Sequence, residues 1–84
     1  MVEKERILIA DDEQDISDVL QERLSFEGYL VFQANNGKEA LEKINEILPD
    51  LVILDITMPE MDGIEVKLKM NSNPATANIP VIFL

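Results

Sequence analysis

The sequence predicts an α/β protein in which helices cover both faces of a parallel β-sheet. Short apolar runs recur along the 84 residues, and segments with apolar residues at three- and four-residue spacing lie between them. Unalternating runs of this kind are typical of strands buried on both faces. Alternating strands and helices favour a parallel sheet with right-handed crossovers. Because two of the runs lead directly into acidic residues, a polar site is expected at the carboxyl edge of the sheet.

The segment around Asp55 shows this organisation most clearly. Residues 51–54 form an uninterrupted apolar run, which predicts a buried strand that ends at Asp55. Pro59 has no N–H to donate to a ladder, so the strand cannot continue through it, and Gly63 closes the segment. Asp55 therefore stands where open α/β sheets bind ligands. Packing is the expected role of Met58 and Met61. A solvated loop is expected to carry Glu60 and Asp62.

The N-terminal part predicts a second buried strand and an amphipathic helix. Residues 7–10 are apolar and lead into Asp11, Asp12 and Glu13. From residue 14 the apolar positions recur at helical spacing, and Gly28 follows them as a C-terminal stop. These positions are Ile16, Val19, Leu20 and Leu24. Asp12 and Glu13 are also suitable caps for this helix, so these acids taken alone do not establish a site.

The rest of the chain continues the alternation. A strand is predicted at residues 29–32, followed by a turn at 35–37 that can cap a helix ending before Pro49. A third, more weakly patterned helix follows Gly63, and the segment after it is rich in turn-forming residues. A last apolar run extends from Val81 to Leu84. The predicted order ends with this fourth strand.

Composition limits the classes of function. The chain has 17 acidic and 7 basic residues and a net charge of −10, so direct binding of nucleic acid is not expected. It contains no cysteine and no histidine, which excludes disulfides, thiolate or imidazole metal ligands and a histidine base. Its charged residues argue against a membrane span, and residues 1–6 are too short and too charged for a signal peptide. A single small domain in the cytoplasm is therefore expected.

The acidic residues after two strands are the candidate site. If the strands at residues 7–10 and 51–54 are neighbours, Asp11, Asp12 and Asp55 converge. Each pair of carboxylates 4 Å apart costs about 4 kcal/mol at an effective dielectric near 20, so a proton or a cation is needed to relieve the repulsion. With oxygen ligands alone, the preferred cation is Mg²⁺. A metal beside a carboxylate nucleophile is suited to phosphoryl transfer.

Two motifs resemble those of a known family. The runs Ile7-Leu-Ile-Ala-Asp-Asp-Glu13 and Leu54-Asp-Ile-Thr-Met-Pro-Glu-Met-Asp-Gly63 together resemble the receiver domain of two-component response regulators. The similarity extends over the whole chain, and the run from Pro80 to Leu84 resembles the family's fourth strand. The resemblance implies a flavodoxin-like, three-layer α/β/α fold with strand order 2-1-3-4-5.

The same resemblance implies roles for individual residues. Asp55 would be the phospho-acceptor, taking a phosphoryl group from the phosphohistidine of a sensor histidine kinase or a phosphotransfer protein. Asp12 and Asp55 would bind Mg²⁺ directly, and Asp11 would act mainly through a metal-bound water. The backbone carbonyl of Thr57 would complete the protein ligands. Such a module signals and is not an enzyme, its chemistry being limited to self-catalysed phosphoryl transfer.

The family pattern also includes elements that this sequence lacks. In the family, a Ser or Thr follows the fourth strand, a Lys ends the fifth strand and a fifth helix follows, whereas this sequence ends at Leu84. Residues 1–84 are therefore expected to form an incomplete receiver domain that does not switch by itself. The last strand, from Val81 to Leu84, is expected to self-associate because it has no neighbour on its outer side.

Two other functions are alternatives. A phosphohydrolase of the haloacid dehalogenase type needs a second acid two residues after the nucleophilic aspartate, but that position is Thr57. The other alternative is a module without phosphoryl chemistry, either an interaction module or a Mg²⁺-binding structural domain.

Overall fold

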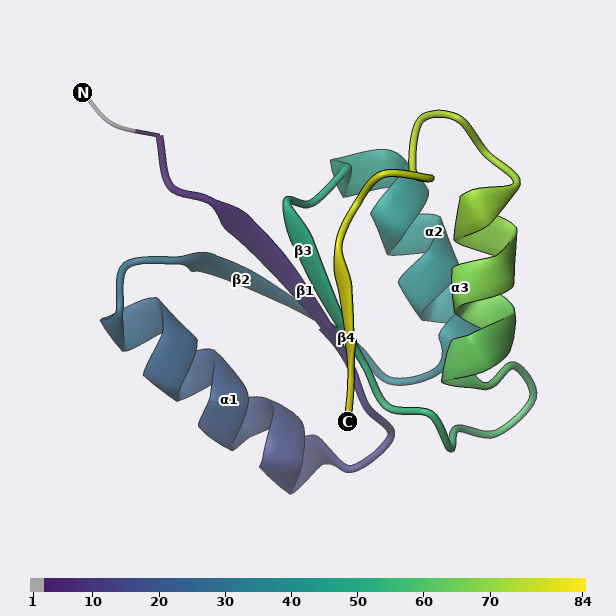
Figure 1. The fold of residues 1–84 in the computed structure, drawn as a ribbon. Helices are drawn as coiled ribbons and strands as arrows, with labels where there is room; N and C mark the ends of the chain where they lie inside the picture. Colours follow the sequence, from purple (N-terminus) through teal and green to yellow (C-terminus); the bar gives the residue numbers. More distant parts are fainter. Residues whose placement is uncertain (1–2) are drawn as a thin grey trace.

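The computed structural model describes residues 3–84, which form strands and helices in the predicted alternation (Figure 1). The strands pair in parallel in the order β2-β1-β3-β4, so the predicted class and strand order are confirmed. The strands are β1 (Arg6–Ala10), β2 (Leu30–Ala34), β3 (Leu51–Leu54) and β4 (Val81–Phe83). The helices are α1 (Gln14–Phe26), α2 (Gly37–Ile47) and α3 (Gly63–Asn71).

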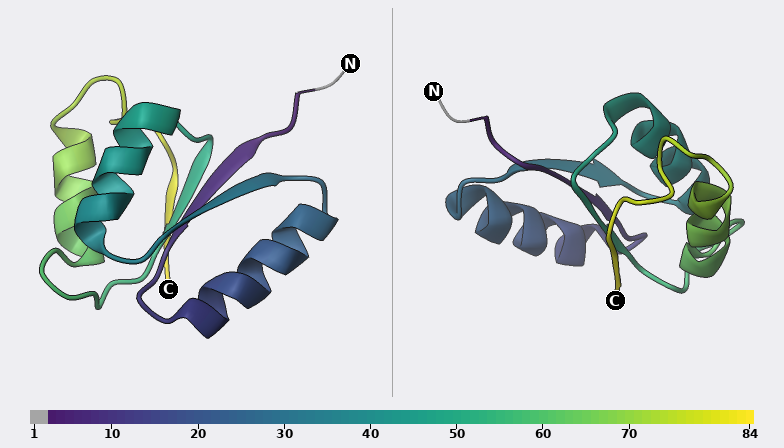
Figure 2. Two further views of the ribbon diagram at one scale, coloured as in Figure 1. Left: turned by 180° about the vertical axis from the view of Figure 1, so that it is seen from behind. Right: turned by 45° about the horizontal axis from the view of Figure 1, so that its top comes forward.

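The helices cover the two faces of the sheet unequally. α1 lies on one face, and α2 and α3 lie side by side on the other (Figures 1 and 2). Successive residues of a strand point to opposite faces, so Leu8 packs towards α2 and α3 while Ile7 and Ile9 pack towards α1. Both faces of β1 are therefore apolar, which explains why its sequence shows no polar alternation.

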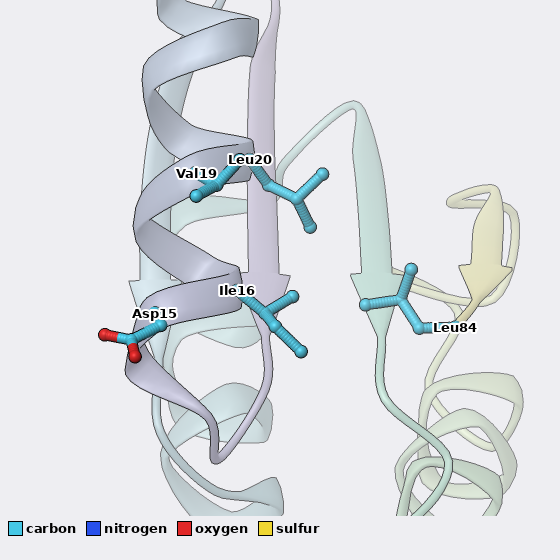
Figure 3. A pocket seen from close by; sticks show the side chains of 5 residues that line it. All are labelled: Asp15, Ile16, Val19, Leu20 and Leu84. Carbon is cyan, nitrogen blue, oxygen red and sulfur yellow. The ribbon is translucent and has the colours of Figure 1, made fainter.

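The apolar stripe of α1 is covered only in part. Leu20 and Leu24 pack against the core, but 42% of Ile16 and 68% of Val19 are exposed. α1 packs on β1 and β2, so its flank towards β4 extends past the strands that it covers. There Ile16 and Leu20 point towards Leu84 across an apolar hollow that Val19 also lines (Figure 3). Helical spacing thus predicted the helix correctly, but not how much of its stripe is buried.

The edge strands differ from their predicted bounds. β2 begins one residue later than expected and continues to Ala34, which pairs with Ala10. β4 lies at the edge of the sheet and ends at Phe83, although the N–H of Leu84 still donates to the carbonyl of Leu54 at 2.8 Å.

None of the helices in residues 3–84 is long and apolar enough to cross a membrane.

Side chains cap two of the helices. Asn36 precedes α2 and its Oδ1 accepts a hydrogen bond from the N–H of Glu39 at 2.8 Å, in agreement with the predicted cap. Asp62 precedes α3 and accepts from the N–H of Glu65 at 2.8 Å. Asp62 lies on the exposed loop, as predicted, and its carboxylate also satisfies an N–H group that the helix leaves unpaired.

Candidate functional site

The pairing of β1 with β3 brings three acidic side chains together. Ala10 lies opposite Leu54 in the parallel register, so the residues that follow them emerge at the same edge of the sheet. The N–H of Asp55 donates to the carbonyl of Ala10 at 2.8 Å, which fixes this alignment. Carboxylate oxygens of Asp11, Asp12 and Asp55 all lie within 4.8 Å of one another. The predicted convergence of these three side chains is confirmed.

The three carboxylates have different surroundings. Asp11 is buried, with 3% of its surface exposed, whereas Asp55 is half-buried and Asp12 is exposed. One oxygen of Asp11 accepts from the N–H of Glu13 at 2.9 Å, and one oxygen of Asp55 accepts from the N–H of Thr57 at 3.1 Å. A carboxylate offers about four acceptor positions, so both groups retain oxygen lone pairs for another partner. The main chain therefore orients these two side chains without saturating them.

The acids beside the cluster do not cap α1 through their side chains. Glu13 occupies the N-cap position, but its side chain makes no capping hydrogen bond. Its main-chain N–H instead donates to Asp11. The Glu13 side chain therefore does not act as an ordinary helix cap.

The donor set fits a hard divalent cation. All of the side chains in the cluster offer oxygen, and the pattern of one buried, one half-buried and one exposed carboxylate leaves an open side for water. Mg²⁺ prefers oxygen ligands and usually keeps several waters, so these residues suit it better than zinc or copper. The assignment of Asp11, Asp12, Asp55 and the Thr57 carbonyl as ligands remains a prediction.

The loop after Asp55 is folded back on itself. The N–H of Gly63 donates to the carbonyl of Ile56 at 2.9 Å, and Met58 is buried in the core, as predicted. Met61 packs against the same core, also as predicted. Glu60 is exposed and has a φ of 68°, in the left-handed region that disfavours side chains other than glycine. The loop therefore combines tight packing with one strained residue.

Sequence reasoning missed two backbone contacts of this loop. Gly37 and Gly63 are the first residues of α2 and α3, and neither has room for a Cβ atom. A Cβ at Gly37 would approach the backbone of Met61, and one at Gly63 would approach the backbone of Asp55. A glycine directly after a capping residue was the available signal, since a better helix former is otherwise expected there.

A family model supports the resemblance noted in the sequence. The model described as "Response regulator receiver domain" matches residues 7–84. The chain is 46% identical over 79 residues to the "Uncharacterized transcriptional regulatory protein YrkP" of Bacillus subtilis, covering 94% of this chain and 32% of that protein. It is 48% identical over 66 residues to "Sporulation initiation phosphotransferase F" of the same organism, covering 79% of this chain and 53% of that protein. The chain thus spans about a third of the length of the first curated relatives that it matches.

Solved structures show the same fold. The N-terminal domain of a response regulator receiver protein from Methanoculleus marisnigri superposes with a TM-score of 0.89 at 44% identity, covering 93% of this chain and 63% of that one. A putative response regulator from Chloroflexus aurantiacus gives a TM-score of 0.92 at 32% identity, covering 96% and 66%. Similarity at this level extends to the order of the strands and to the layers of helices.

Proposed function

The chain belongs to the response regulator receiver domain family, and on that premise we propose that Asp55 accepts a phosphoryl group in a Mg²⁺-dependent reaction. Receiver domains are signalling modules with a flavodoxin-like fold. The observation that carries the proposal is the Asp55 carboxylate at the end of β3, with oxygens of Asp11 and Asp12 within 4.8 Å. The proposed donor is the phosphohistidine of a sensor histidine kinase or of a phosphotransfer protein, and the proposed location is the cytoplasm.

The side chains have separate parts in this reaction. An oxygen of Asp55 forms the new bond to phosphorus, while the P–N bond to the donor imidazole breaks and the imidazole takes up a proton. The Thr57 N–H holds one Asp55 oxygen at 3.1 Å, which leaves the other to attack. Asp11, Asp12, Asp55 and the Thr57 carbonyl would hold Mg²⁺. When bound, the ion supplies positive charge against the phosphoryl oxygens.

The test is phosphorylation of the purified chain by acetyl phosphate, followed by the intact mass. The mass of one phosphoryl group should appear with Mg²⁺ and be absent with EDTA. Asp55→Asn keeps the shape of the side chain but removes its nucleophilic charge, so it should not be labelled. Equal labelling of Asp55→Asn would refute the proposal.

We propose further that residues 1–84 comprise the first four strands and three helices of a receiver domain, and that switching requires more of the domain. The uncovered flank of α1 and the exposed edge of β4 support this. Labelling of this chain should be weaker or shorter-lived than labelling of a version extended by about 40 residues towards a typical domain length. Equal amounts and lifetimes of the acyl phosphate in the two versions would contradict this proposal.

We also propose that the chain self-associates through the outer edge of β4. In residues 3–84, β4 pairs only with β3, and about half of Ile82 and of Leu84 is exposed, at 51% and 50%. Val81 to Leu84 carries no charged side chain, whereas an exposed edge strand is normally protected by a charged residue such as Lys. Sedimentation equilibrium should therefore detect a dimer that Ile82→Lys abolishes. A monomer at tens of micromolar, despite the open edge, would refute this.

A further inference from the structure

The first residue of α3 packs directly on the backbone of Asp55. A Cβ atom at Gly63 would lie closer to the Asp55 carbonyl oxygen than Cβ atoms in proteins lie to any non-bonded atom. It would also lie 3.1 Å from both the Asp55 carbonyl carbon and the Ile56 Cα. The N–H of Gly63 also donates to the Ile56 carbonyl at 2.9 Å. The start of α3 and the Asp55–Ile56 peptide are therefore in contact through main-chain atoms alone.

This contact leaves an added methyl group little room. The neighbouring atoms belong to the backbone and cannot rotate away as the end of a flexible side chain can. The other side of Asp55 is fixed, because its N–H is bonded to the Ala10 carbonyl at 2.8 Å within the sheet. A methyl group at Gly63 would therefore push the Asp55–Ile56 peptide and the start of α3 apart. Thr57, whose N–H orients the Asp55 carboxylate, is the next residue along the chain.

We propose that Gly63 is a positioning residue for the acidic site, holding the Asp55 carboxylate and the Thr57 carbonyl at the separation that Mg²⁺ requires. This inference rests on the proposed Mg²⁺ site. Mg²⁺ needs near-ideal octahedral geometry with oxygens at about 2.0–2.1 Å, whereas Ca²⁺ accepts irregular shells at about 2.3–2.6 Å. A shift of the Asp55–Ile56 peptide thus weakens Mg²⁺ binding more than Ca²⁺ binding. Gly63 thereby contributes to the selectivity of the site as well as to its shape.

Gly37 provides a matched comparison. It is also the first residue of a helix, and a Cβ there would also meet a carbonyl oxygen of the loop, that of Met61, even more closely than a Cβ at Gly63 meets the Asp55 oxygen. The residue that it contacts is six positions from Asp55. Gly37→Ala therefore makes the same chemical change against the same loop, at a distance from the proposed ligands.

The experiment is a titration of the wild type, Gly63→Ala and Gly37→Ala with MgCl₂ and with CaCl₂. Backbone amide NMR spectra show whether each protein is folded and yield both dissociation constants. Gly63→Ala should raise the Kd for Mg²⁺ at least about tenfold, as loss of a supporting contact around a metal site typically does. The Kd for Ca²⁺ should rise less, so the preference for Mg²⁺ falls. Gly37→Ala should retain the wild-type preference even where its melting temperature is lower.

The outcomes separate this inference from the proposed function. No Mg²⁺ binding by the wild type would overturn the cation site and the inference with it. Wild-type binding with an unchanged ratio of Kd values in Gly63→Ala, or the same change in both variants, would overturn the inference alone. If Gly63→Ala is unfolded in buffer, the titration is repeated in trimethylamine N-oxide, which favours the folded state. A chain that stays unfolded there would assign Gly63 to folding and also overturn the inference.

Discussion

Replacing Asp12 by Asn should stabilise the protein in the absence of metal. The change removes one charge from a cluster in which three carboxylate oxygens lie within 4.8 Å of one another. At that separation, each pair of charges costs about 0.9 kcal/mol at the dielectric constant of water and about 3.5 kcal/mol at an effective dielectric near 20. Asp12 is exposed, so the lower value applies and salt screens it further, and losing two repulsive partners should raise the free energy of unfolding by about 1 kcal/mol.

Mg²⁺ should stabilise the wild type more than it stabilises Asp12→Asn. At a tenfold excess over Kd, the ion stabilises the wild type by about 1.4 kcal/mol through linkage. Asp12→Asn lacks a proposed ligand and should gain much less. Mg²⁺ should therefore nearly remove the difference in stability between the two proteins.

Thermal unfolding followed by circular dichroism, in EDTA and in Mg²⁺, measures both effects. In a domain of this size, each 1 kcal/mol raises the Tm by roughly 4–8 °C. Glu22→Gln is the control, because it removes one negative charge from an exposed position on α1 outside the cluster. The reasoning is refuted if Asp12→Asn melts at or below the wild type in EDTA, or if Mg²⁺ shifts both proteins equally.

Three further predictions concern stability and are measured by urea unfolding. Ser17→Ala should raise the free energy of unfolding by about 1 kcal/mol, because the buried Ser17 hydroxyl has no hydrogen-bond partner within residues 3–84; a loss of stability would reveal a partner. Glu60→Gly should raise it by roughly 0.5–1 kcal/mol, because it relieves the φ of 68°, and no gain would mean that this conformation carries no strain. Asn36→Ala should lower it by about 1 kcal/mol, since the bond to Glu39 is lost; Asn36→Asp should be near neutral, and an equal loss there would argue against the cap.

The sequence predicted the features that depend on regular patterns. Residues 7–10 and 51–54 are recognisable because a strand buried on both faces needs no polar alternation. Once these strands were taken as neighbours, parallel pairing required Asp11 and Asp55 to meet at one edge. The acidic cluster was therefore predictable from the order of the strands and the residues that end them.

Other features depend on which atoms lie across a contact, and periodicity does not encode that. The spacing of Val19 indicates an apolar helix face, but its exposure depends on how far the sheet extends beneath α1. The cap formed by Asp62 depends on where α3 begins, which is uncertain by a residue or two in any sequence pattern. The contact of Gly63 with Asp55 joins residues eight positions apart through a loop whose path no local pattern defines.

If Asp55 is the acceptor, the phosphoryl group must be found on its side chain, and its position can be measured. The chain is treated with acetyl phosphate and Mg²⁺, the acyl phosphate is reduced with borohydride to leave a stable mark, and the peptides are sequenced by mass spectrometry. The mark is expected at Asp55 alone, and only when Mg²⁺ is present. A mark at Asp11, Asp12 or Asp62, or one that forms equally well in EDTA, would contradict this expectation.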